Sequence, residues 1–184
     1  MNTSNKLTLS RVLLVPVFMA FLMQSAPVFH WIALVIFIVA SATDGLDGYI
    51  ARKYHQITTF GKFVDPLADK MLTTAAFVIF VADGRMASWA LFVILAREFI
   101  VSGVRLLAVG EGKVIAASIW GKLKTVIQIV TIIAAIFLHD ATFIPAQSVI
   151  AQPITDILMW ITVAITVFSG IDYLVKNWHL MEMK

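Results

Sequence analysis

The residues of this chain best suited to chemistry are four aspartates in one short stretch of an otherwise apolar sequence: Asp44, Asp47, Asp65 and Asp69. Four carboxylates so close together repel one another, and burying all of them ionised is costly without a cation. Oxygen ligands without histidine or cysteine favour the hard ions Mg²⁺ and Mn²⁺ over zinc. The aspartates therefore predict a divalent-metal site, and two such ions would hold a pyrophosphate between them.

Helical spacing would bring the aspartates together from two neighbouring helices. Five residues lie at offsets of zero, three, four, seven and eight and share one helix face: Asp44, Asp47, Gly48, Ala51 and Arg52. Three more repeat every four residues and share a face of the next helix: Gly61, Asp65 and Asp69. Pro66 leaves two alternatives, a helix that Asp65 caps or a longer helix that is kinked at that point. We expect a two-sided site, and solvated loop charges at a helix end are the weaker alternative.

The neighbours of the aspartates suit a phosphorylated ligand. Gly48 and Gly61 carry no side chain, which lets a nucleotide approach the backbone closely. The guanidinium of Arg52 suits a phosphate that metal ions leave partly exposed. The pattern therefore favours a nucleotide or pyrophosphate as the ligand.

The composition of the chain is typical of a membrane protein. Hydrophobic residues make up 60% of the sequence and charged residues 14%, whereas soluble domains have about 45–50% and about 25%. A water-soluble core has no room for that excess, so we expect the bilayer to be the solvent. The 184 residues suit one compact domain, residues 1–184. The absence of cysteine excludes disulfides, thiolate metal sites and a cysteine nucleophile.

Six apolar segments are long enough for membrane helices, some of them only if their polar residues face inward. They are Leu7–Gln24, His30–Ala51, Leu67–Ala82, Ala87–Ala108, Val114–Leu138 and Ile150–Val175. No small-residue cleavage site closes the first segment, so we interpret it as a retained helix and not as a signal peptide. The sequence therefore predicts an all-α fold, a bundle of six transmembrane helices.

Basic residues at alternate helix ends indicate the orientation of this bundle. Cytoplasmic loops retain lysine and arginine, and such residues gather at one set of ends: Lys6, Arg11, Arg52, Lys53, Lys62, Lys113, Lys176 and Lys184. The opposite connections carry only Arg85. We therefore expect a multi-pass protein of the inner membrane whose termini and active site face the cytoplasm. The net charge of +3 suits an anionic leaflet and gives no sign of a nucleic-acid partner.

The spacing D-x2-D-G-x2-A-R-x8-G-x3-D-x3-D resembles the signature of the CDP-alcohol phosphotransferases, membrane enzymes that build phospholipids. Every fixed position of that signature is filled here. Residues 5–11 also resemble the Asn-x-Leu/Ile-Thr-x-x-Arg stretch of the family, and the resemblance covers nearly the whole chain. It implies that an alcohol displaces CMP from a CDP-linked donor with the help of two divalent ions, and that the enzyme is a homodimer.

The same resemblance implies a role for each residue of the motif. Asp44, Asp47 and Asp65 would hold metal. Asp69 would contact metal and take the proton from the attacking hydroxyl. The cytidine diphosphate would lie along Gly48, Ala51, Arg52 and Gly61, with Asn5 and Thr8 beside the nucleotide.

Four further stretches are similar to the bacterial phosphatidylglycerophosphate synthases of that family: residues 65–70, 96–99, 121–125 and 169–173. Those enzymes join CDP-diacylglycerol to sn-glycerol 3-phosphate and release CMP. The similarity implies the same two substrates here, with the lipid bilayer as a further partner.

Basic residues inside the fourth and fifth segments favour an acceptor that carries a phosphate. Arg97 and Arg105 are eight apart and share a helix face, and Lys122 and Lys124 lie near the start of the next helix. Ionisable groups in membrane helices usually face a polar cavity, and an arginine fork matches phosphate oxygens. We expect these residues to bind glycerol 3-phosphate, although Arg105 alternatively snorkels to the interface.

Three other polar residues of these helices have less definite roles. Glu98 is expected to pair with one of the neighbouring bases. Asp172 and Tyr173 either support the site or serve only the fold, and the sequence does not separate the two.

Two alternative functions stay open at this stage. The first keeps the chemistry but uses another acceptor, namely phosphatidylglycerol, serine, inositol or inositol phosphate. The second is a divalent-cation transporter, whose path would also contain aspartates. Transporter carboxylates are usually distributed along a route through the bilayer, whereas these converge at one end beside Arg52, which would repel a permeating cation.

Overall fold

The computed structural model describes residues 3–53, 59–110, 115–116, 118–138 and 149–178, with the backbone alone for 3–7, 44–53, 59–67 and 69. Regular structure in these ranges is entirely helical. Six helices follow one another: α1 (Thr3–Leu22), α2 (Pro27–Lys53), α3 (Thr59–Ala82), α4 (Ser88–Gly110), α5 (Ile119–Ile136) and α6 (Ala151–Lys176). The prediction of an all-α fold with six helices is therefore confirmed.

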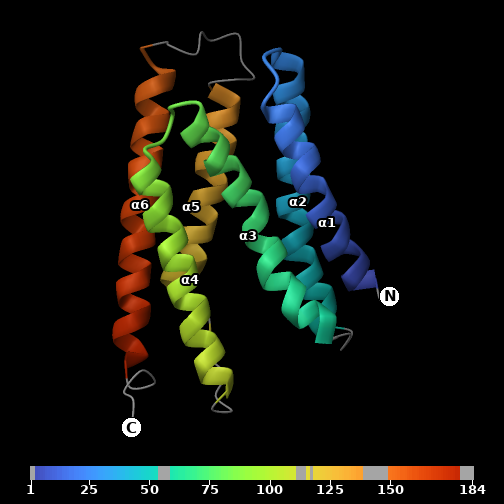
Figure 1. The fold of residues 1–184 in the computed structure, drawn as a ribbon, viewed down its shortest axis with the longest axis vertical. Helices are drawn as coiled ribbons and strands as arrows, with labels where there is room; N and C mark the ends of the chain where they lie inside the picture. The colour runs from blue at the N-terminus through green and yellow to red at the C-terminus, as the bar shows by residue number, and fades with distance from the viewer. Residues whose placement is uncertain (1–2, 54–58, 111–114, 117, 139–148, 179–184) are drawn as a thin grey trace.

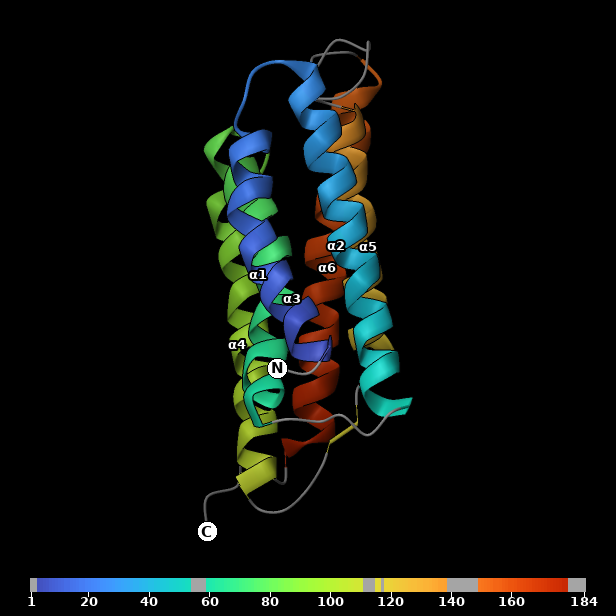
Figure 2. The ribbon, with the colours of Figure 1, turned by 90° about the vertical axis from the view of Figure 1, so that its right-hand side faces the viewer.

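The helices run alternately up and down one elongated bundle (Figures 1 and 2). At one end, which we call the motif end, α2, α4 and α6 finish and α1, α3 and α5 begin. Both ends of the described chain therefore lie at the motif end, together with the parts of α2 and α3 that carry the aspartates.

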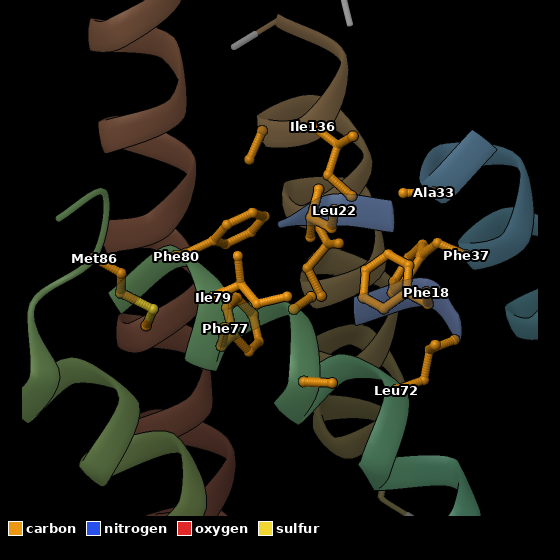
Figure 3. Packing of buried hydrophobic residues seen from close by; sticks show 14 of the residues in the cluster. Phe18, Leu22, Ala33, Phe37, Leu72, Phe77, Ile79, Phe80, Met86 and Ile136 are labelled. Atoms are coloured by element: carbon orange, nitrogen blue, oxygen red, sulfur yellow. The ribbon is translucent and has the colours of Figure 1, made fainter. Parts of the chain in front are cut away.

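The hydrophobic core fills the half of the bundle that is farther from the motif end. Phe18 of α1 packs against Phe37 of α2, with ring centroids 5.7 Å apart (Figure 3). Phe77 and Phe80 of α3 are fully buried in the same cluster. Helix α3 packs against α1, α4 and α5, and Val78 is its only described large apolar side chain that is exposed. Helix α3 is thus the central helix of the bundle.

The outer surface of the bundle is also apolar, as expected for contact with lipid. Large hydrophobic side chains are exposed along α1, α2, α4, α5 and α6, and four of the five tryptophans are among them; the fifth, Trp178, is exposed just beyond α6. Within the described residues, two helices are long and apolar enough to cross a membrane, α5 and α6. Helix α4 is long enough but less apolar, because every 18-residue stretch of it contains three charged residues, Arg97, Glu98 and Arg105.

All six helix starts differ from the sequence-based boundaries, two of them, those of α3 and α5, by five residues or more. Helix α3 begins at Thr59, eight residues before the expected start at Leu67, so Pro66 lies inside the helix. The alternative in which Asp65 caps a helix is therefore wrong. Helix α5 begins at Ile119 and not at Val114, because Ser118 caps it and its side chain accepts a hydrogen bond from the Gly121 amide at 3.0 Å.

Candidate active site

A cavity of about 540 Å³ lies in the motif half of the bundle and is lined by residues from α1 to α5. Its size suits a small phosphorylated molecule. Ser41 of α2 and Lys70 of α3 belong to its wall. They lie three residues before Asp44 and directly after Asp69, so the cavity adjoins the backbone of the aspartate motif.

Positive charge dominates the described wall of this cavity. Six of its described side chains are cationic and one, Glu98, is anionic. The cations are Arg11, Lys70, Arg97, Arg105, Lys122 and Lys124. The structure thus brings together all four bases that the sequence assigned to the acceptor, and it adds two that were not assigned to it.

Glu98 holds three of these cations together from the middle of the cluster. Its Oε1 accepts hydrogen bonds from Lys124 Nζ and, at 3.2 Å, from Arg97 Nη1. Its Oε2 lies 3.5 Å from the Nζ of Lys70. The expectation that Glu98 pairs with a neighbouring base is confirmed, and it pairs with three.

Arg97 is fixed from two sides. Its Nη2 donates to the Oγ of Ser169 at 2.7 Å while Nη1 contacts Glu98. The side chain is only 11% exposed, and its Nε has no hydrogen-bond partner within the described part of the chain. A buried guanidinium N–H without a partner is costly, and an anion in the cavity is the kind of group that would satisfy it.

Sequence reasoning missed some polar residues of the cavity. Lys70 donates a hydrogen bond to Ser102 of α4, and its position inside an apolar helix was a signal that went unused. Gln128 of α5 is 3% exposed, and its Nε2 has no partner within the described residues. Arg11 of α1 is 3% exposed and lines the cavity, whereas in the sequence it had indicated only the orientation of the bundle and the family resemblance of residues 5–11.

The roles left open for two residues of α6 become clearer. Asp172 forms an ion pair with Lys176 one turn further along α6, at 2.7 Å. Tyr173 is buried, and the guanidinium of Arg105 lies 5.8 Å from the centroid of its ring. Neither residue lines the cavity, but Tyr173 supports one that does.

The aspartates occupy the two helix segments that meet the motif end. The first segment, toward the C-terminal end of α2, carries Asp44, Asp47, Gly48, Ala51 and Arg52, and the second, in the first half of α3, carries Gly61, Asp65 and Asp69. The side chains of these residues and of Asn5 lie outside the described part, as do any contacts between them. Thr8 of α1 is described and is 2% exposed. Among the described side chains there is no competing group of three or more metal ligands.

Comparison with known proteins decides the family. Residues 1–168 match the family described as CDP-alcohol phosphatidyltransferase. The chain belongs to this family. The match covers the whole aspartate motif and the described wall of the cavity.

Named relatives are similar over nearly the full chain. A CDP-diacylglycerol–glycerol-3-phosphate 3-phosphatidyltransferase of Bacillus subtilis (strain 168) is 41% identical, over 98% of this chain and 97% of the relative. A protein of the same name from Rickettsia bellii is 31% identical, over 94% and 93%. Another from Haemophilus influenzae is 36% identical, over 91% and 89%.

Proposed function

We propose that this protein transfers the phosphatidyl group of CDP-diacylglycerol to sn-glycerol 3-phosphate, giving phosphatidylglycerophosphate and CMP. The observation that carries the proposal is the cationic cavity beside the aspartate motif, because an acceptor with a phosphate dianion needs such partners. The names of the relatives in Bacillus, Rickettsia and Haemophilus support the same donor and acceptor.

The acceptor would bind with its phosphate between α4 and α5. Arg97 would supply a planar fork of donors, and Lys122 and Lys124 would add charge from the first turns of α5. Arg105 lines the same cavity and would extend the cluster toward the end of α4. Because Glu98 already occupies one side of Arg97 and Lys124, the phosphate would use their remaining donors.

The donor set of the motif fits divalent metal. Asp44 and Asp47 lie near the end of α2, Asp65 and Asp69 lie in α3, and both segments reach the motif end. All four offer only oxygen, which suits Mg²⁺ or Mn²⁺. Two bound ions would supply the positive charge that stabilises the pyrophosphate and the departing CMP.

Asp69 is the residue that we propose as the general base. The acceptor hydroxyl oxygen would form a bond to the phosphorus that bears the diacylglycerol, while the bond from that phosphorus to the CMP oxygen breaks. The hydroxyl proton would pass to the carboxylate of Asp69, and the electron pair of the broken bond would leave with CMP. The CDP group would lie along Gly48, Ala51, Arg52 and Gly61, with Asn5 and Thr8 nearby.

We also propose that the chain is a single membrane domain, residues 1–184, with six spans and the motif end facing the cytoplasm. Arg52 and Lys53 at the end of α2 and Lys176 at the end of α6 belong to the motif end, whereas the turn after α3 carries only Arg85. A homodimer in the inner membrane is the assembly that the family resemblance favours.

An acceptor panel tests the proposal. Purified protein receives CDP-diacylglycerol, Mg²⁺ or Mn²⁺, and one of five acceptors: sn-glycerol 3-phosphate, inositol phosphate, phosphatidylglycerol, serine or inositol. We expect CMP release and a new phospholipid with sn-glycerol 3-phosphate. Preference for another acceptor would mean that the protein catalyses the same type of transfer to a different alcohol. A cation transporter would release no CMP with any of them.

A further inference from the structure

Helix α6 contributes none of the described side chains that line the cavity, yet it packs along α4, which contributes six (Figures 1 and 2). The stretch of α6 from residue 169 to 173 stood out in the sequence and has no part in the proposed chemistry. Its position behind α4 places it against the far side of the cavity's arginines. Any effect of this stretch on the cavity would therefore act through Arg97 and Arg105.

Ser169 is the first of these contacts. Its Oγ accepts a hydrogen bond from Arg97 Nη2 at 2.7 Å, and Ser169 is completely buried. A buried hydrogen bond to a charged donor has well-defined geometry and is stronger than one between neutral groups. It therefore restricts the directions in which the guanidinium of Arg97 can point.

Gly170 is the second contact, and it depends on the absence of a side chain. A Cβ atom placed on Gly170 would lie 2.9 Å from Cγ of Arg97, well inside van der Waals contact. Cγ is close to the backbone, so it moves away only if Arg97 changes its χ1 rotamer or if α4 and α6 separate. Glycine at position 170 therefore makes room for the observed conformation of Arg97.

We propose that Ser169 and Gly170 are positioning residues that hold the guanidinium of Arg97 in the cavity and so determine its affinity for a phosphate group. That the phosphate belongs to glycerol 3-phosphate rests on the proposed function, but the positioning of Arg97 does not. One turn further along α6, the ring of Tyr173 lies under Arg105. Helix α6 thus supports both arginines of α4 without reaching the cavity itself.

Gly170→Ala tests the proposal in the full-length enzyme in detergent. We expect the KM for sn-glycerol 3-phosphate to rise about tenfold, with the KM for CDP-diacylglycerol and kcat within about twofold of wild type. Gly103→Ala is the matched control, because a Cβ there meets no atom within 4 Å. A general loss of packing would lower kcat and change both KM values, and that result would overturn the proposal.

A double variant separates an effect through Arg97 from any other effect of the new methyl group. Arg97→Ala removes Cγ, and its remaining Cβ would lie 3.9 Å from the added atom, which is ordinary contact. We therefore expect Arg97→Ala/Gly170→Ala to have the same KM for glycerol 3-phosphate as Arg97→Ala alone. Additive increases in KM would show that Gly170 acts elsewhere, and the proposal would fall.

Inorganic phosphate provides a readout that does not depend on the reaction. Phosphate should raise the Tm of wild type and of Gly103→Ala, and it should raise the Tm of Gly170→Ala and Arg97→Ala much less. Ser169→Ala should behave like Gly170→Ala, and it decides the matter if Gly170→Ala does not fold. Its control is Thr166→Val, which removes a buried hydroxyl that bonds only to the Thr162 carbonyl in the described contacts.

The KM for glycerol 3-phosphate and the phosphate-dependent Tm together distinguish a failure of the proposed function from a failure of the proposed role of α6. If wild type responds to phosphate but does not use glycerol 3-phosphate, the proposed function is wrong, and the phosphate-dependent Tm of the variants still decides the role of α6. If wild type uses glycerol 3-phosphate and the Gly170→Ala and Ser169→Ala variants match it in both readouts, the role of α6 is wrong and the proposed function stands. A wild type that responds to neither molecule overturns both.

Discussion

Glu98 of α4 and Lys124 of α5 form an ion pair on the wall of the cavity, with side chains 12% and 6% exposed. The same carboxylate contacts Arg97 and Lys70. One anion therefore keeps three cations close together while the described wall stays positively charged overall. The cavity is in this sense preorganised for an anion, since an acceptor phosphate would balance charge that Glu98 leaves unbalanced.

Glu98→Gln should destabilise the protein, because it removes the negative charge that offsets the mutual repulsion of three cations. We expect the free energy of unfolding to fall by about 3 kcal/mol, the scale for breaking a buried ion pair, which would be measured as a lower Tm in detergent. Asp172→Asn is the control: its partner Lys176 is 61% exposed, so its effect should stay below about 1 kcal/mol. Equal effects of the two substitutions would contradict this account of Glu98.

Arg97→Ala should raise the KM for sn-glycerol 3-phosphate about tenfold or more, because a lost charge-assisted hydrogen bond corresponds to about 1.5–3 kcal/mol. The KM for CDP-diacylglycerol should barely change. Arg85, at the opposite end of the bundle in an ion pair with Asp83, provides the control variant Arg85→Ala. Equal increases for both substrates in Arg97→Ala would mean that Arg97 supports the fold or the nucleotide site.

Asp44→Asn and Asp65→Asn should each abolish turnover, since each removes metal-binding charge at nearly constant shape. The measurement is CMP release over a titration with Mg²⁺ and Mn²⁺. Asp156→Asn, an exposed position near the start of α6, should keep normal activity. Substantial turnover of either motif variant at saturating metal would argue against its role as an essential ligand.

Asp69→Asn should impair the chemical step more than substrate binding, because a general base acts in proton transfer. Single-turnover kinetics and a separate binding measurement with CDP-diacylglycerol distinguish the two. Were binding of CDP-diacylglycerol lost together with turnover, Asp69 would be chiefly a metal ligand.

Much of the fold was predictable because helix length and apolar content are local properties. The six helices follow from these, and the shared cavity of Arg97 and Arg105 follows from their spacing of eight residues. The early start of α3 at Thr59 was not predictable from apolar content, since its first turns are polar or carry glycine and proline. The four-residue repeat of Gly61, Asp65 and Asp69 nevertheless indicated a helix there, and a longer helix through Pro66 was one of the two alternatives.

The organisation of the site was less predictable, because it depends on contacts between distant parts of the chain. Ser169 and Arg97 are 72 residues apart, and no local pattern indicates that one holds the other. Glu98 could be expected to pair with a base, but its three partners come from α3, α4 and α5. Lys70 was visible in the sequence, yet only the packing of α3 against α4 assigns it to this cluster.

The most direct test of the central claim follows labelled sn-glycerol 3-phosphate into lipid. Purified wild-type protein, CDP-diacylglycerol and divalent metal are incubated with the labelled acceptor, and CMP and lipid-bound label are counted together. We expect label to enter the lipid fraction in equal amount to the CMP released, and both to disappear in Asp69→Asn. CMP release without incorporation of label, or no CMP release at all, would contradict the proposed function.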